Sequence, residues 1–157
     1  MDQSSRTTPQ RIAVVSSMWH ADIVAKAREA FIDDMSRSGW RANDLVSHDV
    51  PGAFEIPLRA QTLARSGRYA AIVACGMVVD GGIYRHDFVA RTVIDALMRV
   101  QLDTGVPVLS VVLTPQAFHE HEEHRHFFGE HFVKKGREAA RACQHVLAQK
   151  QTQREME

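Results

Sequence analysis

The segment from Ala70 to Val79 constrains the fold of this chain more than any other. It is an almost unbroken apolar run, which ends before Gly81 and Gly82. A strand with one face in water alternates polar and apolar residues, whereas a strand covered on both faces is apolar throughout. The sequence therefore predicts a central strand of a parallel sheet with helices on both sides.

The remaining sequence alternates between short strands and amphipathic helices. Strands are predicted at residues 12–15, 45–50 and 106–113. Apolar residues recur at helical spacing over 20–38, 55–66 and 88–102, and a last helical region runs from about 116 to 148 with a break near Gly129. Strands joined by helices imply right-handed crossovers. We therefore expect an α/β fold of the flavodoxin-like class, a three-layer αβα sandwich around a four-stranded, mainly parallel sheet.

A chain of 157 residues is expected to form one domain over 1–157, with mobile ends at 1–10 and 150–157. Its 19 basic and 19 acidic residues cancel, so no cationic excess indicates a nucleic-acid partner. No run of ~18 apolar residues indicates a membrane span, and the polar start lacks the apolar core of a signal peptide. Cys75 and Cys143 show no CxxC spacing, which argues against a zinc site or a redox pair. We expect a cytoplasmic protein with two buried thiols.

Ligands of open α/β sheets bind at the carboxyl ends of the strands, so the segments that follow the strands form the candidate site. After the first strand, Trp19 could offer its flat face to a planar heterocycle, or it could pack in the core or at an interface. After the second strand, the Gly52-Ala53 step lets a ligand approach the backbone. Glu55 could accept hydrogen bonds from ligand hydroxyls, or the segment could be a capped turn in which Glu55 merely favours the first turn of a helix.

The segment from Cys75 to Asp87 is typical of a strand, a glycine turn and the start of a helix, a geometry that presents amides to a phosphate. It lacks the GxxxxGK[ST] pattern, which excludes a nucleotide P-loop. Arg85 and His86 fall at the start of the predicted helix. There they would lie beside a bound anion or be ordinary surface charges.

Five of the nine histidines lie between His119 and His131. The HExxH zinc pair is absent, because His121 and His124 are three residues apart. We favour a solvated turn with anion contacts over a metal site and expect no metal. Lys135, in the Lys-Lys-Gly run that follows, could place an ammonium on a phosphate or lie in solvent.

In their order and spacing, these segments resemble the 6,7-dimethyl-8-ribityllumazine synthase family over residues 11–148. The resemblance depends on four blocks: an aromatic residue after the first strand, Pro51-Gly52-Ala53-Phe54-Glu55-Ile56-Pro57, Cys75-Gly76 with residues 81–89, and Leu113-Thr114 with Lys135-Gly136. The second block is the most specific. The resemblance implies condensation of 5-amino-6-(D-ribitylamino)uracil with 3,4-dihydroxy-2-butanone 4-phosphate, a transferase reaction of riboflavin biosynthesis that needs no metal or organic cofactor.

The resemblance also implies a role for each matching residue. Trp19 would stack on the pyrimidine ring, and Glu55 would bind the ribityl hydroxyls. The rest of the uracil site would comprise Ala53, Phe54, Met77, Val78, Val79 and Ser110, the last contributed by a neighbouring subunit. The phosphate would be held by Gly82, Ile83, Lys135, and either His124 or Arg125.

Two features depart from the family pattern. Arg85 occupies the position of the family's catalytic histidine, and His86 follows it, so either residue could act in catalysis. The segment 118–131 is also longer than usual. Together with Trp19, it resembles a divergent subgroup in which decamers of two pentamers occur, so we expect a homopentamer or such a decamer.

Two other functions are alternatives to the synthase. Arg85 is the main support for a lumazine- or flavin-binding module with weak or lost catalysis. A phosphoacceptor signalling domain is disfavoured, because Ser16 and Ser17 follow the first strand where that class needs acidic residues for magnesium.

Overall fold

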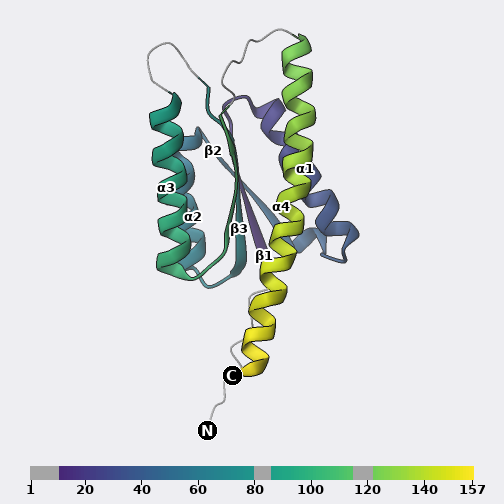
Figure 1. The fold of residues 1–157 in the computed structure, drawn as a ribbon, viewed down its shortest axis with the longest axis vertical. Helices are drawn as coiled ribbons and strands as arrows, with labels where there is room; N and C mark the ends of the chain where they lie inside the picture. Colours follow the sequence, from purple (N-terminus) through teal and green to yellow (C-terminus); the bar gives the residue numbers. More distant parts are fainter. Residues whose placement is uncertain (1–10, 80–85, 115–121) are drawn as a thin grey trace.

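The sheet of the computed structural model has four strands. They are β1 (Arg11–Ser17), β2 (Leu45–Val50), β3 (Tyr69–Met77) and β4 (Val108–Leu113), in the order β2-β1-β3-β4. All three strand pairings are parallel, so the carboxyl ends of the strands lie at one edge of the sheet, uppermost in Figure 1. The structure describes residues 11–79, 86–114 and 122–157, and the side chains of 86 and 122–125 are not described.

Helices cover both faces of this sheet. They are α1 (Ala21–Arg37), α2 (Ile56–Arg65), α3 (His86–Thr104) and α4 (Glu122–Met156), with short 3₁₀ turns η1 (Ala42–Asp44) and η2 (Ala53–Glu55). Helices α1 and α4 lie on one face, and α2 and α3 lie on the other (Figure 1). This arrangement confirms the predicted three-layer α/β fold.

The two central strands supply both hydrophobic cores by alternating their side chains. In β1, Ile12 and Val14 pack with α1 and α4, whereas Ala13 and Val15 pack with α2 and α3. In β3, every residue except Ala70 is buried. The continuous apolar run of the sequence is therefore explained by a strand with a core on each side.

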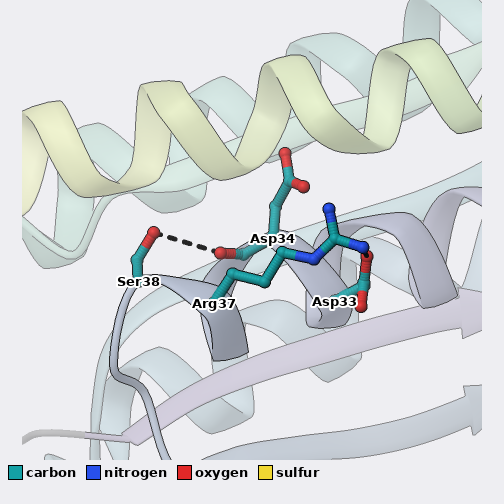
Figure 2. Close-up of polar contacts among 4 residues, drawn as sticks. All are labelled: Asp33, Asp34, Arg37 and Ser38. Carbon is teal, nitrogen blue, oxygen red and sulfur yellow. Dashed lines mark hydrogen bonds and ion pairs between the residues drawn. The ribbon is translucent and has the colours of Figure 1, made fainter.

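Helix α1 ends in a small network of local polar contacts on its solvent side (Figure 2). Arg37 Nη2 lies 3.0 Å from Asp33 Oδ2, and the Ser38 hydroxyl donates a hydrogen bond to the Asp34 carbonyl oxygen at 3.1 Å. An exposed ion pair with this i,i+4 spacing contributes only about 0.3–0.5 kcal/mol. The network helps to end the helix before the chain turns toward β2, at the edge of the sheet where the strands start, opposite the candidate site (Figure 1).

Helix α4 is continuous through Gly129, so the predicted break at this residue is wrong. The physical reason is packing against α1. A β-carbon on Gly136 would collide with the backbone of Ala27, including its carbonyl oxygen, and one on Gly129 would lie 2.9 Å from Cδ of Lys26. The two glycines are one heptad apart and let the helix axes approach closely, and α1 in turn keeps α4 helical.

The predicted end of the last helix near residue 148 is also wrong, because α4 continues to Met156. Where the sequence predicted a mobile end, the structure has two further helical turns, which extend beyond the sheet in Figure 1. Lys150 Nζ ties this part of α4 to the α3–β4 loop by donating to the Gly105 carbonyl oxygen at 2.8 Å.

Candidate active site

The loops that follow β1 and β2 are joined at the carboxyl edge of the sheet. The backbone N–H of Met18 donates to the carbonyl oxygens of Val50 at 2.9 Å and of Pro51 at 3.3 Å. This contact brings together two motifs that lie more than thirty residues apart, the aromatic residue after the first strand and the Pro51–Pro57 block.

Trp19 lies directly against Gly52. A β-carbon at position 52 would fall 2.6–2.9 Å from three atoms of the indole ring, Cε2, Cζ2 and Cδ2. Trp19 is nevertheless 51% exposed, so the alternative of a core tryptophan is wrong. In the structure the indole makes the close approach to Gly52, and approach of a ligand to the backbone at the Gly52-Ala53 step stays a prediction.

Glu55 forms the capped turn that the sequence offered as one of two alternatives. Its Oε2 accepts a hydrogen bond from the Gly52 N–H at 2.9 Å, and its own N–H donates to the Gly52 carbonyl oxygen at 3.2 Å. Beside it, Ala53 is buried and Phe54 is 62% exposed. The turn therefore fixes Gly52 under the indole, and contact of Glu55 with ribityl hydroxyls stays a prediction.

The end of β3 contributes the third motif. Met77 and Val78 are buried, and Val79 is partly buried. The Val78 N–H donates to the Leu113 carbonyl oxygen of β4 at 2.9 Å, so a ligand that addresses the Val78 backbone must use its carbonyl oxygen. A β-carbon on Gly76 would lie 3.1 Å from Cδ1 of Ile56 and 3.2 Å from the Ser17 hydroxyl, which places β3 close to the start of α2.

Ser16 and Ser17 add two buried hydroxyls at the end of β1, a feature that the sequence analysis does not predict. Both residues are at most 2% exposed, and among the described residues neither hydroxyl has a hydrogen-bond partner. An unsatisfied buried hydroxyl costs about 1–3 kcal/mol. The signal available in the sequence was a polar pair at the carboxyl end of an apolar strand.

A left-handed backbone at His20 is a second feature that the sequence did not reveal. His20 has φ 52° and ψ 47°, and it is the one non-glycine residue of the described ranges with a positive φ. Histidine adopts this conformation more readily than most residues, but nothing in the sequence marks the position.

Ser110 and Lys135 make their described hydrogen bonds within their own elements. Ser110 is exposed on the edge strand β4, and its hydroxyl accepts the Val112 N–H at 3.4 Å. Lys135 Nζ on α4 donates to Glu138 Oε2 at 2.9 Å, and this hydrogen bond lowers the pKa of the Glu138 carboxyl. Their predicted roles toward a ligand therefore stay predictions.

The other predicted phosphate and catalytic residues lie outside the described part of the site. Gly82, Ile83 and Arg85 fall in the undescribed range 80–85. His86 is the first residue of α3, and His124 and Arg125 belong to the first turn of α4, but their side chains are not described.

Within the described ranges, no group of three or more His, Cys, Asp or Glu side chains is placed to hold a metal ion. Both cysteines are buried free thiols, and burial raises the pKa of each to about 12. They are therefore neutral near pH 7 and unsuited to nucleophilic attack. None of the helices in the same ranges is long and apolar enough to cross a membrane.

Comparison with known proteins decides which family has this arrangement. Residues 9–151 match the family described as 6,7-dimethyl-8-ribityllumazine synthase. The chain belongs to this family. It is similar to the 6,7-dimethyl-8-ribityllumazine synthase of Rhodococcus erythropolis, with 63% identity over 85% of this chain and 86% of the relative.

Two relatives carry the name 6,7-dimethyl-8-ribityllumazine synthase 2. The one from Pseudomonas syringae pv. tomato is 52% identical over 94% of this chain and 87% of its own length. The one from Bradyrhizobium diazoefficiens is 58% identical over 88% of this chain and 83% of its own length. The lumazine synthase resemblance that the Pro51–Pro57 block indicated is therefore confirmed.

Proposed function

We infer that this chain catalyses the lumazine synthase reaction, which joins 5-amino-6-(D-ribitylamino)uracil to 3,4-dihydroxy-2-butanone 4-phosphate and gives 6,7-dimethyl-8-ribityllumazine. The observation that carries this inference is the family match over residues 9–151, with 52% and 63% identity to two named synthases over most of each chain. The chain is thus a transferase of riboflavin biosynthesis.

The reaction needs positioning and proton transfer. The uracil amine attacks the ketone, and loss of water gives an imine. Phosphate then leaves as the sugar-derived carbons rearrange, and the second amine closes the ring with loss of another water. Holding two substrates in the reactive geometry can supply much of the rate enhancement, and side chains that exchange protons near neutral pH supply more.

We propose that the uracil substrate binds at the joined β1 and β2 loops. Trp19 would stack on the pyrimidine, because half of its surface is open while Gly52 supports the other side. The Glu55 carboxylate, held by the Gly52 N–H, would accept hydrogen bonds from the ribityl chain. The remaining contacts would come from Ala53, Phe54, Met77, Val78 and Val79, and from Ser110 of a neighbouring subunit.

We propose that the phosphate is held by residues that precede α3 together with residues of α4. Gly82, Ile83, Lys135, and His124 or Arg125 would hold it. Lys135 is only partly exposed and would exchange its hydrogen bond with Glu138 for one with the phosphate. Charge-assisted hydrogen bonds to phosphate are stronger than those between neutral groups, which favours the exchange.

Arg85 and His86 are our candidates for catalysis. Arginine stays charged across the physiological range, so Arg85 would stabilise the leaving phosphate rather than transfer protons. Histidine titrates near neutrality, so His86 would be the proton-transfer group. The pH–rate profiles of Arg85→His and His86→Ala test these roles. A gain of about tenfold or more in Arg85→His, about 1.4 kcal/mol of barrier, with full activity in His86→Ala would contradict the His86 role.

We propose that the working unit is a homopentamer or a decamer of two pentamers. The support is an apolar surface on α2 and α3, where Leu58 is 71% and Leu102 is 74% exposed, together with Ile94 and Met98. A shallow cavity of about 270 Å³ lies between these helices. Ile94, Met98 and Leu102 are spaced four residues apart and so share one exposed face of α3, and exposed apolar patches are typical of protein interfaces. Free buried thiols also favour our proposal of a cytoplasmic location.

Native mass spectrometry tests the assembly. Leu58→Glu with Leu102→Glu should shift the protein toward smaller species, whereas the matched control Gln153→Glu on the exposed end of α4 should not. A wild-type protein that is monomeric and fully active would refute the proposal.

Product formation tests the function. The purified protein should form 6,7-dimethyl-8-ribityllumazine from the two substrates with repeated turnovers, and not when either substrate is omitted. Tight binding of the lumazine without turnover would instead support a binding module.

A further inference from the structure

The indole of Trp19 packs against Gly52 and occupies space that a side chain at this position would need. Gly52 has φ −144° and ψ 178°, an extended conformation that alanine adopts without strain. A β-carbon there would nevertheless lie 2.6 Å from Cε2 of the ring. The backbone conformation therefore does not require glycine at position 52. The indole requires it, because the ring occupies the space of a side chain.

The indole is held along the chain by its two neighbours. On one side, the Met18 N–H is bound to the carbonyl oxygens of Val50 and Pro51. On the other, His20 has a left-handed backbone, and its carbonyl oxygen accepts the N–H groups of Ile23 and Val24, both at 3.0 Å. His20 thus starts α1 and turns the chain sharply just after Trp19.

We propose that His20 and Gly52 are positioning residues that together set the orientation of the Trp19 ring for stacking on the planar ring of the ligand. His20 acts through its left-handed backbone, and Gly52 acts through its missing side chain. The inference rests on the proposed function for the identity of the ligand, but the placement of the ring can be measured without any ligand.

Gly52→Ala tests the contact with the ring. In a Trp40→Phe background, Trp19 is the single tryptophan, so its fluorescence reports the ring alone. The added methyl should shift the Trp19 emission and its quenching by acrylamide. It should raise KM for the uracil substrate about two- to tenfold, the range expected for a stacking contact, and leave KM for the phosphate substrate unchanged.

A double substitution shows whether the indole is the cause. In a Trp19→Ala background, Gly52→Ala should have no further effect on KM for the uracil substrate. The proposed role of Gly52 is refuted if Gly52→Ala raises KM for the uracil substrate equally with and without the indole. It is also refuted if Gly52→Ala leaves the Trp19 emission unchanged.

Three substitutions separate the backbone of His20 from its side chain. Asparagine and glycine accept the left-handed conformation, whereas valine does not. His20→Asn and His20→Gly should therefore keep the wild-type Trp19 emission and uracil KM, and His20→Val should shift both. If His20→Val does not fold, His20→Ala provides a smaller shift in the same direction.

The possible outcomes are distinct. Equal losses in His20→Asn, His20→Gly and His20→Val would assign the role to the imidazole and overturn the proposal. Wild-type behaviour of His20→Val would overturn it too. A protein that forms no lumazine would refute the proposed function. The emission of ligand-free Trp19 in the same variants would still decide whether His20 and Gly52 set the orientation of the ring.

Discussion

The two helical layers differ in how far this chain completes them by itself. Between α1 and α4, the backbones meet at Gly136 and Ala27, and Phe31 and Phe132 are fully buried. On α2 and α3, by contrast, Leu58 and Leu102 are mostly exposed.

This difference indicates where the protein can tolerate change and where it can bind another molecule. The α1–α4 layer leaves no room for a side chain at Gly136, so mutations at this contact should act on folding. The α2–α3 layer exposes apolar side chains that the proposed assembly would bury, so mutations of these side chains should act on assembly. Among the described candidate substrate contacts, those that follow β1 and β2 and end β3 lie at the carboxyl edge that the two layers share, whereas Lys135 lies on α4 and Ser110 lies within β4.

The substitution with the largest expected effect tests whether the α1–α4 layer, which contains Lys135, also contributes to substrate binding. Lys135→Ala should raise KM for the phosphate-bearing substrate about tenfold to a hundredfold, because a charge-assisted contact to phosphate is worth about 1.5–3 kcal/mol. KM for the uracil should change little. Steady-state kinetics with each substrate varied in turn measures both values.

Glu138→Gln is the matched control, because it removes the negative charge of the described partner of Lys135 and leaves the ammonium in place. It should keep the wild-type KM. Equal losses for both substrates in Lys135→Ala would show that the residue supports the fold instead.

Gly136→Ala should lower the free energy of unfolding by about 1–3 kcal/mol, because the new methyl would overlap the Ala27 backbone, which cannot move aside. This cost should exceed the helix propensity gained, about 1 kcal/mol. Gly129→Ala is the matched comparison, because its methyl would meet only the flexible end of Lys26. It should be neutral or stabilising. Urea denaturation of both variants measures the difference, and equal effects would contradict the close packing of α1 and α4.

Ser16→Ala and Ser17→Ala should each raise the free energy of unfolding by about 1 kcal/mol, because each removes a buried hydroxyl without a described partner. Alternation along β1 directs Ser16 toward the α1–α4 layer and Ser17 toward the other. Urea denaturation measures the free energy of unfolding of both variants, with Ser47→Ala at an exposed position as the control. A loss of stability in one variant would reveal a hydrogen bond in that layer.

The smallest effect concerns His48, whose Nε2 lies 3.3 Å from the Tyr69 hydroxyl on the α2–α3 side. Burial lowers the pKa of His48 below 6.5, with further lowering by Arg59 and Arg68 and an opposing effect of Asp49. The folded state then binds fewer protons than the unfolded state, so stability should fall as the pH drops through 6.5.

His48→Gln should weaken this pH dependence. Denaturation one unit above and one unit below pH 6.5 provides the comparison. If the free energy of unfolding changes with pH equally in wild type and variant, the pH dependence belongs to another group.

The sequence was most informative where one physical factor dominates. Strand β2 has the predicted bounds, and the apolar run after Tyr69 forms the predicted central strand. The Pro51–Pro57 block led to the correct family before any geometry was known.

It was least informative where contacts between distant segments decide the outcome. Gly129 looks like a helix break until α1 packs against it. β1 runs on through Ser16 and Ser17, because their neighbours in the sheet extend equally far. The approach of Trp19 to Gly52 and the backbone of His20 depend on a loop–loop contact that no local pattern encodes.

The most direct test of the central claim is to measure phosphate release and lumazine formation together, in one reaction with both substrates. The account predicts equal amounts of the two products over many turnovers of the protein, and, at uracil concentrations below KM, an equal fall of about two- to tenfold in both in Trp19→Ala. Phosphate release without lumazine, or lumazine formation no faster than the uncatalysed reaction, would contradict it.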